Sequence, residues 1–114
     1  MKPDPKRDEL LQELHRRLTE LYGERLDRLV LFGSHARGEN RPDSDLDVLV
    51  VLNGEVPWPG REIDRMLDIS HDLSVRYGQL VSLIPTSAHS YVHEQSPLFI
   101  NVHREGIRIT AEAE

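Results

Sequence analysis

Cysteine is missing from this chain of 114 residues, which excludes a disulfide framework, a thiolate zinc site and a cysteine nucleophile. Aromatic residues make up only 5% of the chain, so the core must consist mainly of Leu, Val and Ile. The longest apolar run, Val48 to Leu52, is far shorter than a membrane span. Residues 1–10 are charged and contain no apolar signal-peptide segment. These absences predict a soluble, cytoplasmic protein that does not enter a membrane.

The charge balance is acidic, with 14 basic and 20 acidic residues and a formal net charge of −6. Nucleic-acid affinity depends on Lys and Arg side chains that neutralise phosphates, so we expect no direct nucleic-acid binding. Hydrophobic residues at 38% and charged residues at 30% are ordinary values for a folded chain. No linker-like or repetitive stretch divides the sequence, and its length predicts a single domain over residues 1–114.

The hydrophobic pattern predicts helices and strands in alternation. Leucines between residues 10 and 21 recur at helical spacing, whereas residues 48–52 form the continuous apolar run of a strand covered on both faces. The predicted helices cover residues 8–21, 61–77, 87–95 and 97–105, and the predicted strands cover residues 28–32, 45–52, 80–84 and 107–110. This order predicts an α+β fold with a small mixed sheet and helices packed mainly on one face.

A Gly-Ser pair follows the first predicted strand. Gly33 has no Cβ, so backbone N–H groups can approach a phosphate closely, and Ser34 adds a hydroxyl donor. Ser34 is also predicted to cap a short helix over residues 35–37, whose free N–H groups would point at a triphosphate. Arg37 either adds positive charge to this site or pairs with a nearby aspartate.

Two aspartates open the second predicted strand. Asp45 and Asp47 are separated by one residue, so the two-residue period of a strand aims both carboxylates at one spot. Carboxylate oxygens are the ligands that Mg²⁺ prefers, together with waters and substrate phosphates. Two such ions would activate an attacking hydroxyl and stabilise a pyrophosphate leaving group. The pattern therefore predicts nucleotidyl transfer, with Asp45 and Asp47 as catalytic and metal-binding residues.

Each motif alone has a plain structural interpretation. Gly33 is compatible with an ordinary turn, and Asp45 with a turn or helix cap. The pair is more specific, because ten residues separate the Gly-Ser pair from Asp45 and an apolar strand adjoins each motif.

The stretch from Leu31 to Val51 resembles the DNA polymerase β-type nucleotidyltransferase superfamily. The resemblance lies in Gly33-Ser34-x-Ala36-Arg37-Gly38, followed by Ser44-Asp45-x-Asp47 and an apolar strand. Within that superfamily, the short chain is similar to the minimal nucleotidyltransferases, or MNT domains. The resemblance implies the polymerase β-type fold, two Mg²⁺ ions and ATP as the substrate. It also implies nucleotide binding through Gly33, Ser34 and Arg37.

The same resemblance implies a biological partner. MNT domains are commonly antitoxins paired with helical HEPN toxins, and they can transfer AMP to a tyrosine of the partner. The leading interpretation is therefore an adenylyltransferase antitoxin. The alternative is a catalytically degenerate module that neutralises its partner by binding alone. Transfer to a small molecule such as an aminoglycoside is a third, more distant interpretation, since a second domain would normally build the acceptor pocket.

The match departs from the family at the third carboxylate, which a later strand normally supplies. Alignment of residues 78–83 with the family pattern places Gln79 at that position. Glutamine offers only a neutral oxygen, a weaker Mg²⁺ ligand than a carboxylate and a poor base. Asp68 and Asp72 on the preceding helix are possible substitutes, although we expect both to face solvent.

Two further groups of residues have more than one interpretation. Six histidines are present, but His89 and His93 alone are a weak indication of a zinc site. Trp58, Tyr91, Phe99 and Val102 fit either core packing or a hydrophobic patch that docks a partner.

Overall fold

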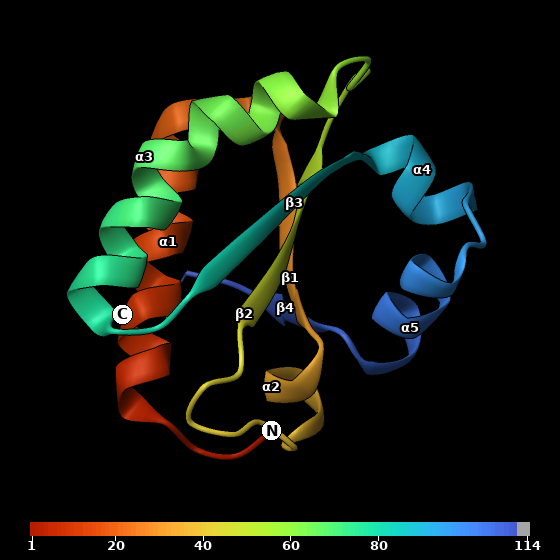
Figure 1. Ribbon diagram of the computed structural model, residues 1–114. Helices are drawn as coiled ribbons and strands as arrows, with labels where there is room; N and C mark the ends of the chain where they lie inside the picture. Colours follow the sequence, from red (N-terminus) through yellow and green to blue (C-terminus); the bar gives the residue numbers. More distant parts are fainter. Residues whose placement is uncertain (112–114) are drawn as a thin grey trace.

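A four-stranded mixed sheet forms the centre of the computed structural model, which describes residues 1–111 (Figure 1). Its strands are β1 (Leu26–Phe32), β2 (Leu46–Leu52), β3 (Val81–Ser87) and β4 (Ile107–Ile109), in the order β3-β2-β1-β4. β1 is antiparallel to β2 and β4, whereas β2 and β3 are parallel. A parallel pair requires a long crossover, which a helix between β2 and β3 supplies. The predicted α+β class with a small mixed sheet is confirmed.

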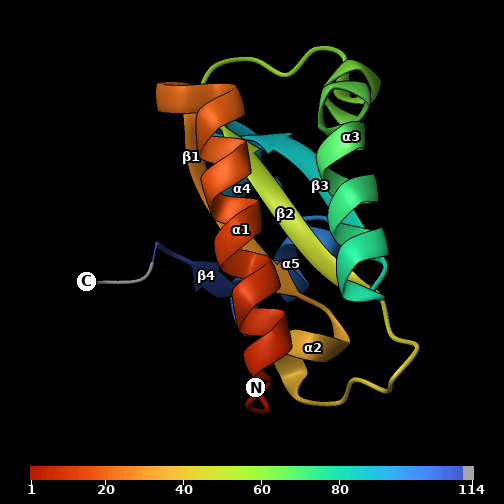
Figure 2. The ribbon, with the colours of Figure 1, turned by 90° about the vertical axis from the view of Figure 1, so that its left-hand side faces the viewer.

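Two long helices, α1 (Pro5–Tyr22) and α3 (Pro59–Tyr77), lie side by side on one face of the sheet (Figure 2). The side chain of Asp4 caps α1 by accepting a hydrogen bond from the Arg7 backbone N–H at 3.1 Å. Both helices end at glycines with positive φ, because Gly tolerates that conformation best. The leucines at helical spacing point inward as predicted, and Leu14 and Leu18 are fully buried.

Two shorter helices, α4 (Ala88–His93) and α5 (Pro97–Glu105), pack against the opposite face. Figure 1 shows them on the far side of the strands from α1 and α3. Phe99 and Val102 of α5 join a second apolar cluster with Leu49 and Val51 of β2. The sequence therefore located all four longer helices, and the two largest share one face. Within residues 1–111, no helix is both long enough and apolar enough to cross a bilayer.

The side chains of β2 alternate between these two layers. Val48 and Val50 belong to the cluster under α1 and α3, whereas Leu49 and Val51 belong to the cluster under α5. All four are 0% exposed, which explains the unbroken apolar run in the sequence. The same alternation directs Asp47 toward the α4–α5 side of the sheet.

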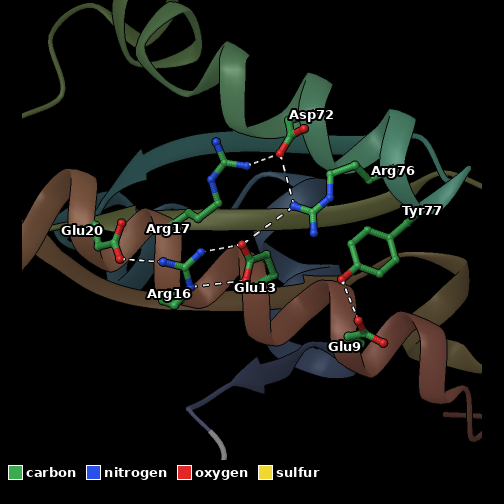
Figure 3. Close-up of polar contacts among 8 residues, drawn as sticks. All are labelled: Glu9, Glu13, Arg16, Arg17, Glu20, Asp72, Arg76 and Tyr77. Atoms are coloured by element: carbon green, nitrogen blue, oxygen red, sulfur yellow. Dashed lines mark hydrogen bonds and ion pairs between the residues drawn. The ribbon is translucent and has the colours of Figure 1, made fainter.

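Ion pairs join the outer surfaces of α1 and α3 (Figure 3). Arg17 of α1 contacts Asp72 of α3 at 2.5 Å, and Arg76 contacts both Asp72 (3.4 Å) and Glu13 (3.9 Å). The hydrogen bond from Arg17 is the main cause that lowers the pKa of Asp72. Asp72 is thus engaged on the α1–α3 layer, and the sheet separates it from Asp47. The Asp72 side chain is 43% exposed, in line with the expectation that it faces solvent, and it cannot substitute for a third metal ligand.

Candidate active site at the Gly-Ser turn

Gly33 connects β1 to the short helix α2 (Ser34–Arg37) in a conformation that other residues rarely adopt. Its φ of 79° and ψ of −157° lie in a region that is almost restricted to glycine. A Cβ added to Gly33 would lie 2.6 Å from the Oδ2 atom of Asp47, closer than real Cβ contacts. Two independent reasons therefore require glycine at position 33: the backbone conformation of the turn and the close approach of the Asp47 carboxylate.

The helix α2 confirms the predicted short helix, but its start differs by one residue. Ser34 is the first helical residue rather than the cap, and Gly33 occupies the cap position without a side-chain hydrogen bond. Because Gly33 can adopt the required backbone angles, the chain turns one residue earlier than the Ser cap predicted. Gly38, with φ of 75°, ends the helix. The Ser34 side chain is half-buried and is not used as a cap.

The two aspartates lie at the start of β2, beside this turn. Asp47 pairs with Phe32 of β1 and is half-buried, whereas Asp45 is exposed and precedes the strand by one residue. Leu46 between them is fully buried in the α1–α3 layer, so the two carboxylates project to the other side. Asp47 lies against Gly33, and Asp45 is close enough to Asp47 for its charge to raise the pKa of that carboxyl group.

Electrostatics favour a cation at this position. Burial raises the pKa of Asp47, and the neighbouring Asp45 carboxylate raises it further, while His35 and Arg37 act in the opposite direction. A bound cation would relieve the repulsion between the two carboxylates. Over residues 1–111, no cluster of three or more His, Asp or Glu side chains is arranged to hold a metal ion. The residues fit Mg²⁺ as two carboxylate ligands, with the remaining positions left to water and substrate phosphates.

The strand register brings Ser82, rather than Gln79, next to Asp47. Asp47 pairs with Ser82 across the parallel β2–β3 ladder, and paired residues of neighbouring strands project to the same face. Gln79 lies before β3, and its side-chain amide donates to the Ser44 carbonyl oxygen at 2.5 Å. Asp68 is exposed on α3. Neither Ser82 nor Gln79 contributes a carboxylate beside Asp47.

Arg37 leaves α2 toward α5 and is held by two acids. Its guanidinium contacts Glu105 at 3.0 Å and Glu39 at 3.3 Å. The side chain of Glu105 is 17% exposed, whereas that of Glu39 is 67% exposed. The expected acid partner of Arg37 is thus present, but it comes from α5 and from the loop after α2 rather than from an aspartate.

Sequence reasoning missed Ser82, Glu105 and a buried arginine, Arg7, that contacts the residue after Ser34. The Nη1 atom of Arg7 lies 3.2 Å from the Nδ1 atom of His35, and both side chains are buried. No local motif indicates these positions, because each depends on contacts between distant segments. The Asp4-Pro5 pair is a typical helix start and could have placed Arg7 in the first turn, but the predicted helix began at residue 8.

The four residues with two interpretations differ in burial. Phe99 and Val102 are buried in the α5 core, and Tyr91 packs against that core, whereas Trp58 is 66% exposed before α3. The rings of His89 and His93 lie 4.5 Å apart on α4.

Comparisons with known proteins agree with this geometry. Residues 11–97 match the family model described as the nucleotidyltransferase domain. A candidate protein adenylyltransferase of Methanocaldococcus jannaschii is 34% identical over 76 residues, which cover 67% of this chain and 75% of that protein.

Solved structures share the fold at low sequence identity. A toxin-antitoxin complex with AMP-PNP contains a chain with a TM-score of 0.61 and 16% identity, over 96% of this chain and 75% of that chain. A complex of tri-AMPylated Shewanella oneidensis HEPN toxin with MNT antitoxin matches with a TM-score of 0.53 and 15% identity, over 92% of this chain and 73% of that chain. These likenesses confirm the expected nucleotidyltransferase fold.

Proposed function

The chain belongs to the nucleotidyltransferase domain family, and from that premise we propose that it transfers AMP from ATP to a protein hydroxyl with Mg²⁺. The observation that carries the proposal is the close approach of Asp47 to Gly33. The 2.6 Å between the Asp47 oxygen and a hypothetical Cβ at Gly33 leaves no room for a side chain. The close approach brings the Asp47 carboxylate next to a turn whose backbone N–H groups can bind phosphate.

Each residue has a defined task in this proposal. The turn at Gly33 and Ser34 binds the triphosphate through N–H groups and the Ser34 hydroxyl, and Arg37 adds positive charge. Asp45 and Asp47 hold Mg²⁺, which would stabilise charge on the phosphates during displacement. The acceptor hydroxyl attacks the α-phosphorus, loses its proton to water and forms a new P–O ester bond. The bond from the α-phosphorus to the pyrophosphate oxygen breaks, and pyrophosphate leaves.

The proposed acceptor is a tyrosine of a HEPN-type toxin, in a cytoplasmic toxin-antitoxin pair. Support comes from the shared fold with the MNT antitoxin of the Shewanella oneidensis complex, whose HEPN toxin is tri-AMPylated. The Methanocaldococcus jannaschii relative adds support, because it is a candidate protein adenylyltransferase.

A second function has one specific observation in its favour. Asp47 has Ser82 beside it, so this site has two carboxylates where the family resemblance implies three. A binding-only antitoxin, which neutralises its partner by contact, would tolerate that loss.

Transfer of the α-phosphate label of ATP to a purified HEPN-type toxin tests both functions. We expect label that depends on Mg²⁺ and is lost in Asp45→Asn and Asp47→Asn. Asp43→Asn is the matched control, since Asp43 is an exposed acid of the same loop outside the site. If no label appears on the partner even with Mg²⁺, while the partner still binds and is inhibited, the binding-only function replaces the transferase.

A further inference from the structure

A small pocket lies beneath the Gly-Ser turn, where the start of α1 meets the loop after α2 and the end of α3. These segments converge at the lower end of the molecule in Figure 2. The pocket has a volume of about 210 Å³, enough for several water molecules. Its polar lining includes Asp4, Lys6, Arg7, His35, Asn40 and Arg41. None of these residues has a task in the proposed transfer reaction.

Arg7 is the central feature of this pocket, because its charge is buried without a counter-ion. The residue is 3% exposed and makes no ion pair with a carboxylate anywhere in residues 1–111. Two of its nitrogens contact the His35 ring and the Lys2 carbonyl oxygen, but its Nε atom has no hydrogen-bond partner. A buried guanidinium without an opposite charge is costly, so an anionic ligand would stabilise it.

Asn40 supplies a second unsatisfied atom in the same pocket. Its side-chain Oδ1 is buried and accepts no hydrogen bond. Buried acceptors normally have a partner, so a ligand that also carries a donor would satisfy this atom.

The charge of the lining favours an anion. Lys6, Arg7 and Arg41 are cationic, and among residues 1–111 the side chains of Lys6 and Arg41 make no ion pair. Asp4 is the acid in the lining, and its Oδ1 accepts the backbone N–H of Arg7. Burial lowers the pKa of His35, as expected of a neutral ring whose Nδ1 atom accepts a hydrogen bond from Arg7. The pocket is thus positive within a chain of net charge −6.

We propose that this pocket binds a hydrogen phosphate ion. Arg7, Lys6 and Arg41 donate hydrogen bonds to its charged oxygens, and Asn40 Oδ1 accepts the hydrogen bond from its O–H group. Sulfate has the same shape and charge but carries no proton at neutral pH. It would leave Asn40 unsatisfied, so the pocket selects phosphate over sulfate.

Occupancy of the pocket also affects the neighbouring turn. His35 contacts the Ser44 carbonyl oxygen at 3.5 Å, and Gln79 donates to the same oxygen at 2.5 Å. Ser44 directly precedes Asp45. An ion that holds Arg7 and His35 in place would therefore also fix the position of the backbone at Asp45. This site does not depend on the proposed transferase, since its ligands are different residues.

Thermal unfolding with inorganic phosphate, in EDTA and at constant ionic strength, tests the proposal. We expect a saturable rise in Tm with phosphate. The Kd for sulfate should be about tenfold weaker, the equivalent of one hydrogen bond to a charged group. Arg41→Gln should weaken phosphate binding by a similar factor, and Arg7→Met should abolish it. Arg61→Gln is the matched control, because Arg61 is an exposed arginine of α3 away from the pocket.

Different results would overturn the proposal. An equal Tm rise in Arg41→Gln and the control would mean nonspecific ion binding. A rise that requires Mg²⁺, or disappears in Asp45→Asn, would place the phosphate at the Gly-Ser turn instead. Because Arg7→Met removes a buried group and risks misfolding, ³¹P line broadening with the exposed Arg41→Gln variant provides an independent measurement.

Discussion

The two faces of the sheet differ in how fully they are covered. One face is covered by the 18-residue α1 and the 19-residue α3, over a cluster of eighteen buried residues among positions 1–111. The other is covered by the 6-residue α4 and the 9-residue α5, over a cluster of six buried residues in the same range. The half-buried Asp47 lies on this second, more open face. The sheet therefore separates the larger apolar core from the proposed active site. Substitutions in that core should change stability without changing nucleotide binding, and substitutions at the site should change binding.

Leu73→Ala should produce the largest change. Leu73 is 0% exposed in the α1–α3 core, and loss of a buried leucine side chain typically costs about 2–5 kcal/mol. Urea unfolding should show this decrease in the free energy of unfolding. Mg²⁺-ATP affinity of the still-folded protein should remain unchanged at low temperature. A loss of nucleotide affinity in the folded variant would contradict the separation of the two faces.

Gly33→Ala should affect the second face. The positive φ of Gly33 makes alanine strained by about 1–3 kcal/mol, and the new Cβ would collide with the Asp47 carboxylate. We expect a moderate fall in Tm and a complete loss of the Tm rise caused by Mg²⁺-ATP. Gly54→Ala is the control, since Gly54 has a similar φ of 81° with nothing within 4 Å of its Cβ position. If both variants bind nucleotide alike, the Gly33–Asp47 approach has no role in binding.

Ser82→Asp and Gln79→Glu form a matched pair that identifies the missing third ligand position. The register pairs Ser82 with Asp47, so a carboxylate at 82 should strengthen Mg²⁺-dependent ATP binding several-fold. Gln79→Glu should bring no gain and should weaken the contact with the Ser44 carbonyl oxygen. Calorimetric titration with and without Mg²⁺ measures both. A gain in Gln79→Glu alone would mean that residue 79, as the sequence alignment indicated, occupies the third ligand position.

Asp47→Asn should slightly raise stability near neutral pH while it removes activity. Burial raises the pKa of Asp47 in the folded state, so its ionised form costs stability above that pKa. The cost disappears as the pH falls through the raised pKa toward the ordinary aspartate value. The gain in the free energy of unfolding should therefore shrink between neutral and acidic pH, and it should stay well below about 1 kcal/mol because solvent screens this partly exposed group. A constant gain over that range would mean that ionisation of Asp47 is not the cause.

Arg17→Gln should have the smallest effect, on the first face. The Arg17–Asp72 contact of 2.5 Å is partly exposed at the surface, where ion pairs contribute little. We expect a slight fall in Tm that disappears at high salt, with unchanged nucleotide binding. A fall that persists at high salt would indicate that the arginine stem contributes packing instead of charge.

The helices and the Gly33–Asp47 site were largely predictable from local signals. Helical leucine spacing, positive-φ glycines and the two-residue strand period depend on residues close in sequence. The start of α2 was displaced by one residue because Gly33, rather than Ser34, adopts the cap position.

The contacts between distant segments were not predictable. The position of Ser82 beside Asp47 depends on the register of the β2–β3 ladder, which the length and packing of the connection through α3 determine. The register cannot be obtained from the pattern of β3, because apolar and polar residues do not alternate regularly along it. Likewise, the buried position of Arg7 results from the packing of α1 against the turn, and nothing in its sequence neighbours marks an arginine as buried.

The strand order has a consequence for how this protein folds. β1 and β2 are joined by residues 33–45, a connection that contains Gly33, the helix α2 and Asp45, so the candidate site lies at the most local strand pair. β4 pairs with the same β1 from the other end of the described chain, a contact with a much larger loop-closure cost. We expect the β1–β2 ladder to form early and β4 to dock late. A nascent chain would then assemble its candidate nucleotide site before the last helix covers the sheet.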